Sequence, residues 1–418
     1  MNIIKPIIVS IGLFFAISAN GQSYNIFNDS AQNGWNVRIL NYTEGKNMNR
    51  LLLSYQNPNE NTLYPAIGIF ENGSIKITQL MSEPVINIFP FVLKPDNGLA
   101  LPTTTIQNQK YWYDLKELDE KGKSANLINV AIYPYQILAG GIYPLFNKTY
   151  LELTTIQKEP DNGGQSAFYN VWFKLIAFDE EKSYKKEIHS DQRIKSVFNE
   201  EAISGCKGND TLIYILARRF TKKDFSEFEG VLYAVGYSGR VLWSDKIPWN
   251  KDNTLSIFSY NNGVVLCDAN GYDKFLFPNS TFLTFYDVNG KTTKGAILDK
   301  FVAACGLETS DKNLILGGSV YKVDSIGKVV VKKAKTVLLG KDFAIKQEDV
   351  LDFYEGPDGE LTMMQYATSN EILSITEKKD KTFILTGSVY KPSELTPFSA
   401  RVHYGMLLYA DPSGKISR

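Results

Sequence analysis

Histidine is nearly absent from the 418-residue chain, which contains only His189 and His403. A zinc site with three histidine ligands is therefore impossible, and neither histidine stands in an HExxH motif or near paired cysteines. The chain also lacks the patterns GxxxxGK[ST] and GxGxxG, which hold nucleotide phosphates. We therefore expect both histidines to be surface or structural residues, and we expect no phosphate-binding loop.

Cysteine is also scarce, with three residues at Cys206, Cys267 and Cys305 and no CxxC pair. Neither a redox motif nor a zinc knuckle is indicated. This count is compatible with one disulfide and one leftover thiol, and it is also compatible with three free thiols. We expect the three to be small buried apolar residues.

Net charge is absent as well, because 45 Lys and Arg residues balance 45 Asp and Glu residues. A nucleic-acid binder normally carries a basic excess, so we expect no nucleic-acid partner. The balance also argues against a strong polybasic attraction to anionic lipids.

Long apolar runs are confined to the N-terminus, where residues 7–19 read IIVSIGLFFAISA. Small residues at the −3 and −1 positions follow, which predicts a signal peptide over residues 1–21 with cleavage before Gln22. The run is shorter than the roughly 20 residues that a membrane-spanning helix needs. We therefore expect a mature chain, residues 22–418, without a transmembrane segment. It would be exported to the periplasm, the outer cell surface or the medium.

A repeated segment is the most informative feature that is present. DKNLILGGSVYK begins at Asp311, and DKTFILTGSVYK begins at Asp380. The apolar, β-branched and aromatic content of each copy predicts a strand. Glycine weakens a strand interior, so Gly318 and Gly387 are expected to mark a bulge or a close backbone approach. The two segments should be equivalent strands of two repeated units.

Turn signals recur along the whole chain at intervals of about 50 to 75 residues. They lie near Gly73, Gly122, Glu181, Gly239, Gly290, Gly340 and Gly414. The best candidate helix, residues 182–201, is the only interruption of this all-β pattern. Many short strands at such a period predict a β-propeller with seven blades, although six or eight also fit. A large β-sandwich, or two all-β domains divided near residues 200–208, are the alternatives.

The C-terminal half resembles a known class of repeat proteins. VLYAVGYSGRVLWSDKI begins at Val231, and FYDVNGK and YADPSGK match its turn. These segments resemble the blades of secreted bacterial β-propellers of the quinoprotein-like and kelch-like kind. The resemblance covers Asn209–Arg418 better than the N-terminal half. It implies a propeller fold and carries no catalytic residue.

Candidate site residues are few. DANGYD places side-chain oxygens at Asp268, Asn270 and Asp273, as a calcium loop does, but it lacks the DxDxDG order and the distal glutamate. A polar turn is the simpler interpretation, so we expect no cofactor, with calcium as the one possibility. Trp243 and Trp249 could stack on sugar rings or anchor a protein partner.

The absence of a catalytic motif favours a non-enzymatic propeller that binds a protein or glycan partner, or acts as a scaffold, at the cell envelope. The alternative is a carboxylate-based glycan hydrolase or lyase with its site in the propeller centre. A third possibility is a cell-surface piece of a longer chain, because the final residues GKISR stop where a last strand could begin. Either the N-terminal strand closes the ring, or an open edge invites a partner strand.

Overall fold

A computed structural model of the chain describes an all-β protein. It describes residues 24–27, 35–45, 48–57, 62–71, 74–81, 83–85, 87–88, 91–94, 98–107, 110–119, 124–133, 137–144, 149–158, 168–178, 185–194, 199–222, 226–249, 253–270, 280–323, 330–351, 370–391 and 402–417. Within these ranges no residue is helical, and no helix is long and apolar enough to cross a membrane.

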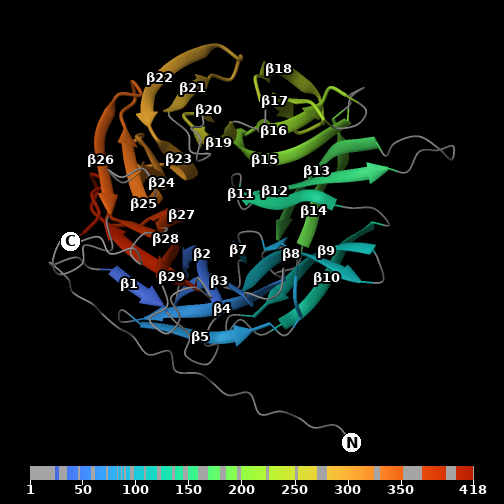
Figure 1. The fold of residues 1–418 in the computed structure, drawn as a ribbon. Coiled ribbons are helices and arrows are strands. Elements are labelled where there is room, and N and C mark those ends of the chain that lie inside the picture. The colour runs from blue at the N-terminus through green and yellow to red at the C-terminus, as the bar shows by residue number, and fades with distance from the viewer. Residues whose placement is uncertain are drawn as a thin grey trace, which may run out of the picture.

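Seven antiparallel sheets form a ring around a central axis (Figure 1). Blade 1 contains β2 (Asn36–Glu44), β3 (Asn49–Gln56), β4 (Leu63–Glu71) and β5 (Ser74–Leu80). Blade 2 contains β6 (Asn87–Ile88), β7 (Val92–Leu93), β8 (Leu99–Gln107), β9 (Lys110–Leu118) and β10 (Ser124–Tyr133). Blade 3 contains β11 (Ile137–Pro144), β12 (Thr149–Lys158), β13 (Phe168–Phe178) and β14 (Lys185–Arg193). Blade 4 contains β15 (Asn199–Asn209), β16 (Leu212–Phe220), β17 (Phe228–Gly236) and β18 (Val241–Ile247).

The remaining blades follow the same pattern. Blade 5 contains β19 (Thr254–Tyr260), β20 (Gly263–Asn270), β21 (Ser280–Tyr286) and β22 (Thr292–Asp299). Blade 6 contains β23 (Phe301–Glu308), β24 (Leu314–Val323), β25 (Val330–Leu339) and β26 (Ile345–Leu351). Blade 7 contains β27 (Asn370–Glu377), β28 (Phe383–Lys391), β29 (Val402–Ala410) and, from the other end of the chain, β1 (Tyr24–Phe27).

This architecture confirms the predicted seven-bladed propeller and excludes the β-sandwich. Residues 200–208 lie inside β15, the inner strand of blade 4. The predicted helix over residues 182–201 was wrong, because residues 185–193 form β14 and pair with β13. Pairing with a neighbouring strand overrides the weak helix propensity of a lysine- and glutamate-rich segment.

The predicted turns at Gly239, Gly290, Gly340 and Gly414 follow the third strand of their blades, and those at Gly73, Gly122 and Glu181 lie outside the described residues. Gly239, Gly290 and Gly414 have φ angles of 83°, 80° and 82°. Glycine reaches this left-handed conformation without the steric cost that a Cβ atom adds. In the blade 5 turn, Asp287 Oδ1 accepts hydrogen bonds from the backbone N–H groups of Asn289 and Lys291.

The repeated DK segments form β24 and β28, which are the second strands of blades 6 and 7. Both glycines face a bulge in the adjacent inner strand, as the sequence predicted. A Cβ atom on Gly318 would lie 2.0 Å from the carbonyl oxygen of Val302, and one on Gly387 would lie 1.8 Å from that of Glu371. Glycine is therefore required at both positions.

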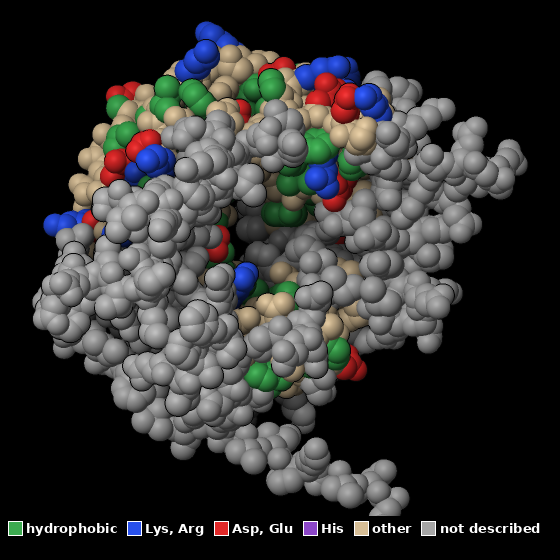
Figure 2. Space-filling view, viewed as in Figure 1, with side chains coloured by type: hydrophobic (Ala, Val, Ile, Leu, Met, Phe, Trp, Pro, Cys, Tyr) green, Lys and Arg blue, Asp and Glu red, His purple; other side chains and the backbone are tan. Residues whose placement is uncertain are grey.

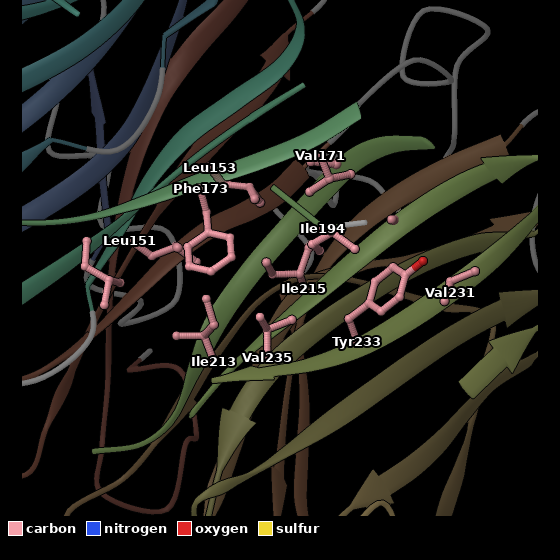
Figure 3. Packing of buried hydrophobic residues seen from close by; sticks show 13 residues of the cluster. Leu151, Leu153, Val171, Phe173, Ile194, Ile213, Ile215, Val231, Tyr233 and Val235 are labelled. Atoms are coloured by element: carbon pink, nitrogen blue, oxygen red, sulfur yellow. The ribbon is translucent and has the colours of Figure 1, made fainter. Parts of the chain in front are cut away.

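Apolar clusters between neighbouring blades form the core. In Figure 3, Leu151, Leu153 and Phe173 of blade 3 face Ile213 and Ile215 of blade 4. Further clusters join blades 4 and 5, 5 and 6, 6 and 7, 7 and 1, and 1 and 2. Among the described residues, six of the seven pairs of neighbouring blades thus bury apolar side chains against each other.

The ring is closed by the N-terminal strand. β1 pairs antiparallel with β29, with Tyr24 opposite Leu408 and Phe27 opposite Gly405. It therefore covers the edge of β29 that would otherwise offer unpaired backbone groups to another chain.

Candidate functional site in the central cavity

The inner strands β15, β19, β23 and β27 surround a cavity of about 880 Å³. Its wall consists of residues 203–208, 255–259, 304–308 and 373–375, with Tyr143, Asn262, Thr309, Ser310, Lys312 and Glu377. Figure 2 shows the hollow at the centre of the ring. The volume suits a small ligand, since ligand pockets typically measure roughly 300–1,000 Å³.

Bulges in the inner strands shape this wall. Ile203, Ala304 and Leu373 are the extra residues at register shifts in β15, β23 and β27, and all three line the cavity. A bulge redirects side chains beside it. The residues that follow the bulges, Ser204 and Cys305 among them, also line the cavity.

Two glutamates stand at one end of the cavity in equivalent positions. Glu308 ends β23 and Glu377 ends β27, and each precedes its repeated Asp-Lys pair by three residues. Glu308 accepts hydrogen bonds from the Asn261 backbone N–H (2.7 Å) and from Lys312 Nζ (2.7 Å). Glu377 accepts hydrogen bonds from the Ser310 backbone N–H and from Ser310 Oγ, both at 2.8 Å. These hydrogen bonds hold both carboxylates in place.

The sequence-based prediction missed this pair, although a signal for it existed. Extending the two repeats backwards gives ETSDKNLIL from Glu308 and EKKDKTFIL from Glu377. The alignment therefore places two glutamates in register, one at the end of each inner strand. The prediction rested only on the residues that follow each DK pair.

Two further polar groups in the wall have no bonding partner among the described residues. Lys207 of β15 is half-buried, and its ammonium group has no hydrogen bond or ion pair there. Ser204 Oγ is buried and likewise has no partner there. By contrast, Ser256 and Ser259 donate to the carbonyl oxygens of Ala303 (3.3 Å) and Lys207 (2.8 Å).

The three cysteines are free thiols, and Cys206 and Cys305 line the cavity. Burial raises the pKa of the Cys206 thiol to about 12, against a smaller lowering by its hydrogen bond with Ser259. Burial also raises the pKa of Cys305. Since the thiolate is the nucleophile, these thiols are poorly suited to attack a substrate near neutral pH.

A second polar cluster lies near the other end of β15. Glu200 Oε1 accepts hydrogen bonds from Arg219 Nε (2.7 Å) and from the Tyr233 hydroxyl (2.6 Å). The Glu200 side chain is 1% exposed, and among the described residues its Oε2 atom has no partner. Burial and the neighbouring Glu200 charge raise the pKa of Tyr233. This cluster joins β15, β16 and β17 within blade 4.

Both predicted tryptophans pack at the interface of blades 4 and 5 rather than in the cavity wall. The Trp243 ring stacks on Tyr286, with ring centroids 5.7 Å apart, and its Nε1 donates to the Val288 carbonyl oxygen at 3.0 Å. Trp249 Nε1 donates to the Asn253 carbonyl oxygen at 3.1 Å. The Trp249 ring also lies below the Arg218 guanidinium, 5.9 Å from the ring centroid.

The suggested calcium residues are described only in part. Asp268 and Asn270 end β20, and Asp273 lies outside the described residues. The two Asp268 oxygens accept from Asn253 Nδ2 (3.0 Å) and Asn270 Nδ2 (3.3 Å). Across the described part of the chain, no three His, Cys, Asp or Glu residues are grouped closely enough to hold a metal ion. Calcium stays a prediction.

Comparison with known proteins identifies the fold but no family. No family model matches the sequence, and no curated protein sequence matches it. An oligogalacturonate lyase in complex with manganese has a similar structure, with 9% identity, a TM-score of 0.52, and coverage of 96% of this chain and 97% of that one. The polysaccharide lyase Uly1 has 9% identity and a TM-score of 0.51, and the match covers 97% of this chain and 98% of that one. At this identity the likeness establishes a propeller fold.

These structures correct the sequence-based choice of function. The sequence favoured a non-enzymatic binding propeller because it contains no visible catalytic motif. Two enzymes share the fold along nearly their whole length, so the missing motif does not support a non-enzymatic propeller. That step of the prediction was wrong, because functional groups on a shared fold need not form a contiguous motif. The manganese of the first enzyme finds no matching ligand group among the residues described in this chain.

Proposed function

We propose that the protein is an exported carbohydrate-active enzyme, a glycan lyase or hydrolase, whose site is the central cavity. The observation that carries the proposal is the pair of equivalent glutamates at the mouth of a cavity of about 880 Å³. The propeller fold shared with two lyases supports it. Export rests on the signal-peptide pattern of residues 1–21, and a closer relation to quinoprotein-like or kelch-like propellers rests on the blade motif alone.

The cavity offers the groups that glycan cleavage requires. A hydrolase needs two carboxyl groups on either side of the glycosidic bond, one of which donates a proton. A lyase needs a base and a cation that neutralises a sugar carboxylate. Glu308 and Glu377 provide the carboxyl groups, and Lys207 and Lys312 provide the cations. Lys312 is already paired with Glu308, so among the described residues of the wall Lys207 is the cation available to a ligand.

The direct test is a screen of residues 22–418 against neutral and acidic oligosaccharides with two readouts. Ultraviolet absorbance of an unsaturated sugar reports a lyase, and new reducing ends without that absorbance report a hydrolase. If one glutamate acts as acid or base, Glu308→Gln or Glu377→Gln should lower the rate by about 10²- to 10⁴-fold.

The control for these variants is Glu71→Gln, because Glu71 is exposed at the end of β4 in blade 1. It should leave the rate unchanged, and thermal melts should show that all three variants are folded. Cleavage that neither cavity variant affects would place the reaction elsewhere. Failure of every glycan to bind or react would refute the proposal.

A further inference from the structure

Among the charged groups described in the cavity wall, one has neither an ion pair nor a side-chain hydrogen bond. Glu308 and Lys312 form an ion pair at 2.7 Å, and both Glu377 oxygens accept hydrogen bonds from Ser310. Lys207 alone has neither a salt bridge nor a side-chain hydrogen bond to the described residues. The Lys207 side chain is half-buried in the cavity wall, and its ammonium group can form an ion pair or hydrogen bonds with a ligand there.

A second unmatched donor comes from the same strand. Ser204 Oγ is buried in the described structure without a partner, although Ser256, Ser259 and Ser374 all have one. The Ser204 hydroxyl is closed off from the cavity, and no bulge separates it from Lys207, so the two side chains point to opposite faces of β15. The side-chain donor of β15 that a cavity ligand can reach is therefore the Lys207 ammonium group. An ammonium group without a counter-charge fits a ligand that carries a carboxylate.

We propose that Lys207 binds the carboxylate of a uronic acid, so that the enzyme acts on acidic glycans. This inference rests on the proposed function and narrows it to elimination. A neutralised carboxylate makes the neighbouring C5 proton easier to remove. A base then takes that proton, the C4–O4 bond breaks, a C4=C5 double bond forms, and the departing oxygen receives a proton. No water and no redox partner is consumed.

The test uses calorimetric binding of galacturonate, glucuronate and mannuronate oligomers, each also as its methyl ester, which removes the negative charge. The wild-type protein should bind at least one acid form more tightly than its ester. Lys207→Met should weaken that acid form by about 10- to 100-fold and abolish the difference, because a charge-assisted hydrogen bond is lost. Lys207→Arg should retain most of the preference.

The control is Lys291→Met, which changes an exposed lysine in the turn between β21 and β22 and should not affect binding. Added salt should weaken the binding of the acid form more than the binding of the ester. Equal binding of acid and ester, or an unaltered preference in Lys207→Met, would overturn this inference. Cleavage of neutral glycans would then still uphold the proposed function, whereas inactivity on every glycan would end both.

Discussion

Replacing Gly387 with alanine should destabilise the propeller severely, although it adds only one methyl group. The new Cβ atom would lie 1.8 Å from the carbonyl oxygen of Glu371, over 1 Å inside the 3.0 Å limit that real Cβ atoms respect. Either β27 or β28 must shift, and overpacking of this kind costs about 3 kcal/mol. Gly318→Ala meets the Val302 oxygen at 2.0 Å and should cost a similar amount.

Denaturant unfolding followed by tryptophan fluorescence measures this effect, and the two variants together should cost about 6 kcal/mol because the sites lie in different blades. Gly236→Ala is the matched control, since its Cβ would find its nearest neighbour at 3.6 Å. It should stay within about 0.5 kcal/mol of wild type. A Gly387→Ala protein that unfolds at the wild-type midpoint would refute the role assigned to the bulged inner strands.

Three further predictions concern other parts of the ring. Arg219→Met should lower the free energy of unfolding by about 3–5 kcal/mol, because it leaves the buried Glu200 without its cation. Adding Glu200→Gln to this variant should recover part of the lost stability, and no recovery would contradict the pairing. Stability should fall as the pH rises from about 9 to about 12, because burial raises the pKa of Cys267 to about 12 and the folded state retains a proton that the unfolded state releases. The urea midpoint of Cys267→Ala should fall less steeply with pH than that of the wild type. An equal dependence of the two midpoints on pH would count against this cause. Deleting residues 22–28 should lower the melting temperature and promote self-association on gel filtration, because it exposes the edge of β29; an unchanged monomer would show that β1 is dispensable.

The fold could be predicted from the sequence because each blade repeats local rules. Hairpin turns such as those at Gly239 and Gly290 need left-handed backbone, and glycine at those positions indicates them. Strand content and period then predict blades, and the two DK copies correctly identify equivalent second strands. Gly318 and Gly387 also predict the bulges, since glycine inside a strand usually marks a bulge or a close backbone approach.

The candidate site was harder to predict because its residues come from five blades. Lys207 and Glu377 are 170 positions apart in the sequence, yet both line one cavity. Nothing in the local pattern around Lys207 shows that its ammonium group lacks a partner among the described residues. The tryptophans stand out for their size, but size alone does not separate a binding platform from packing between blades, where Trp243 and Trp249 lie.

A crystal structure of residues 22–418 with a bound acidic oligosaccharide tests the central claim most directly. We expect sugar density inside the cavity between β15 and β27, with a carboxylate within hydrogen-bond distance of Lys207 Nζ. Sugar bound on the outer strands, with the cavity holding only water, would contradict the claim.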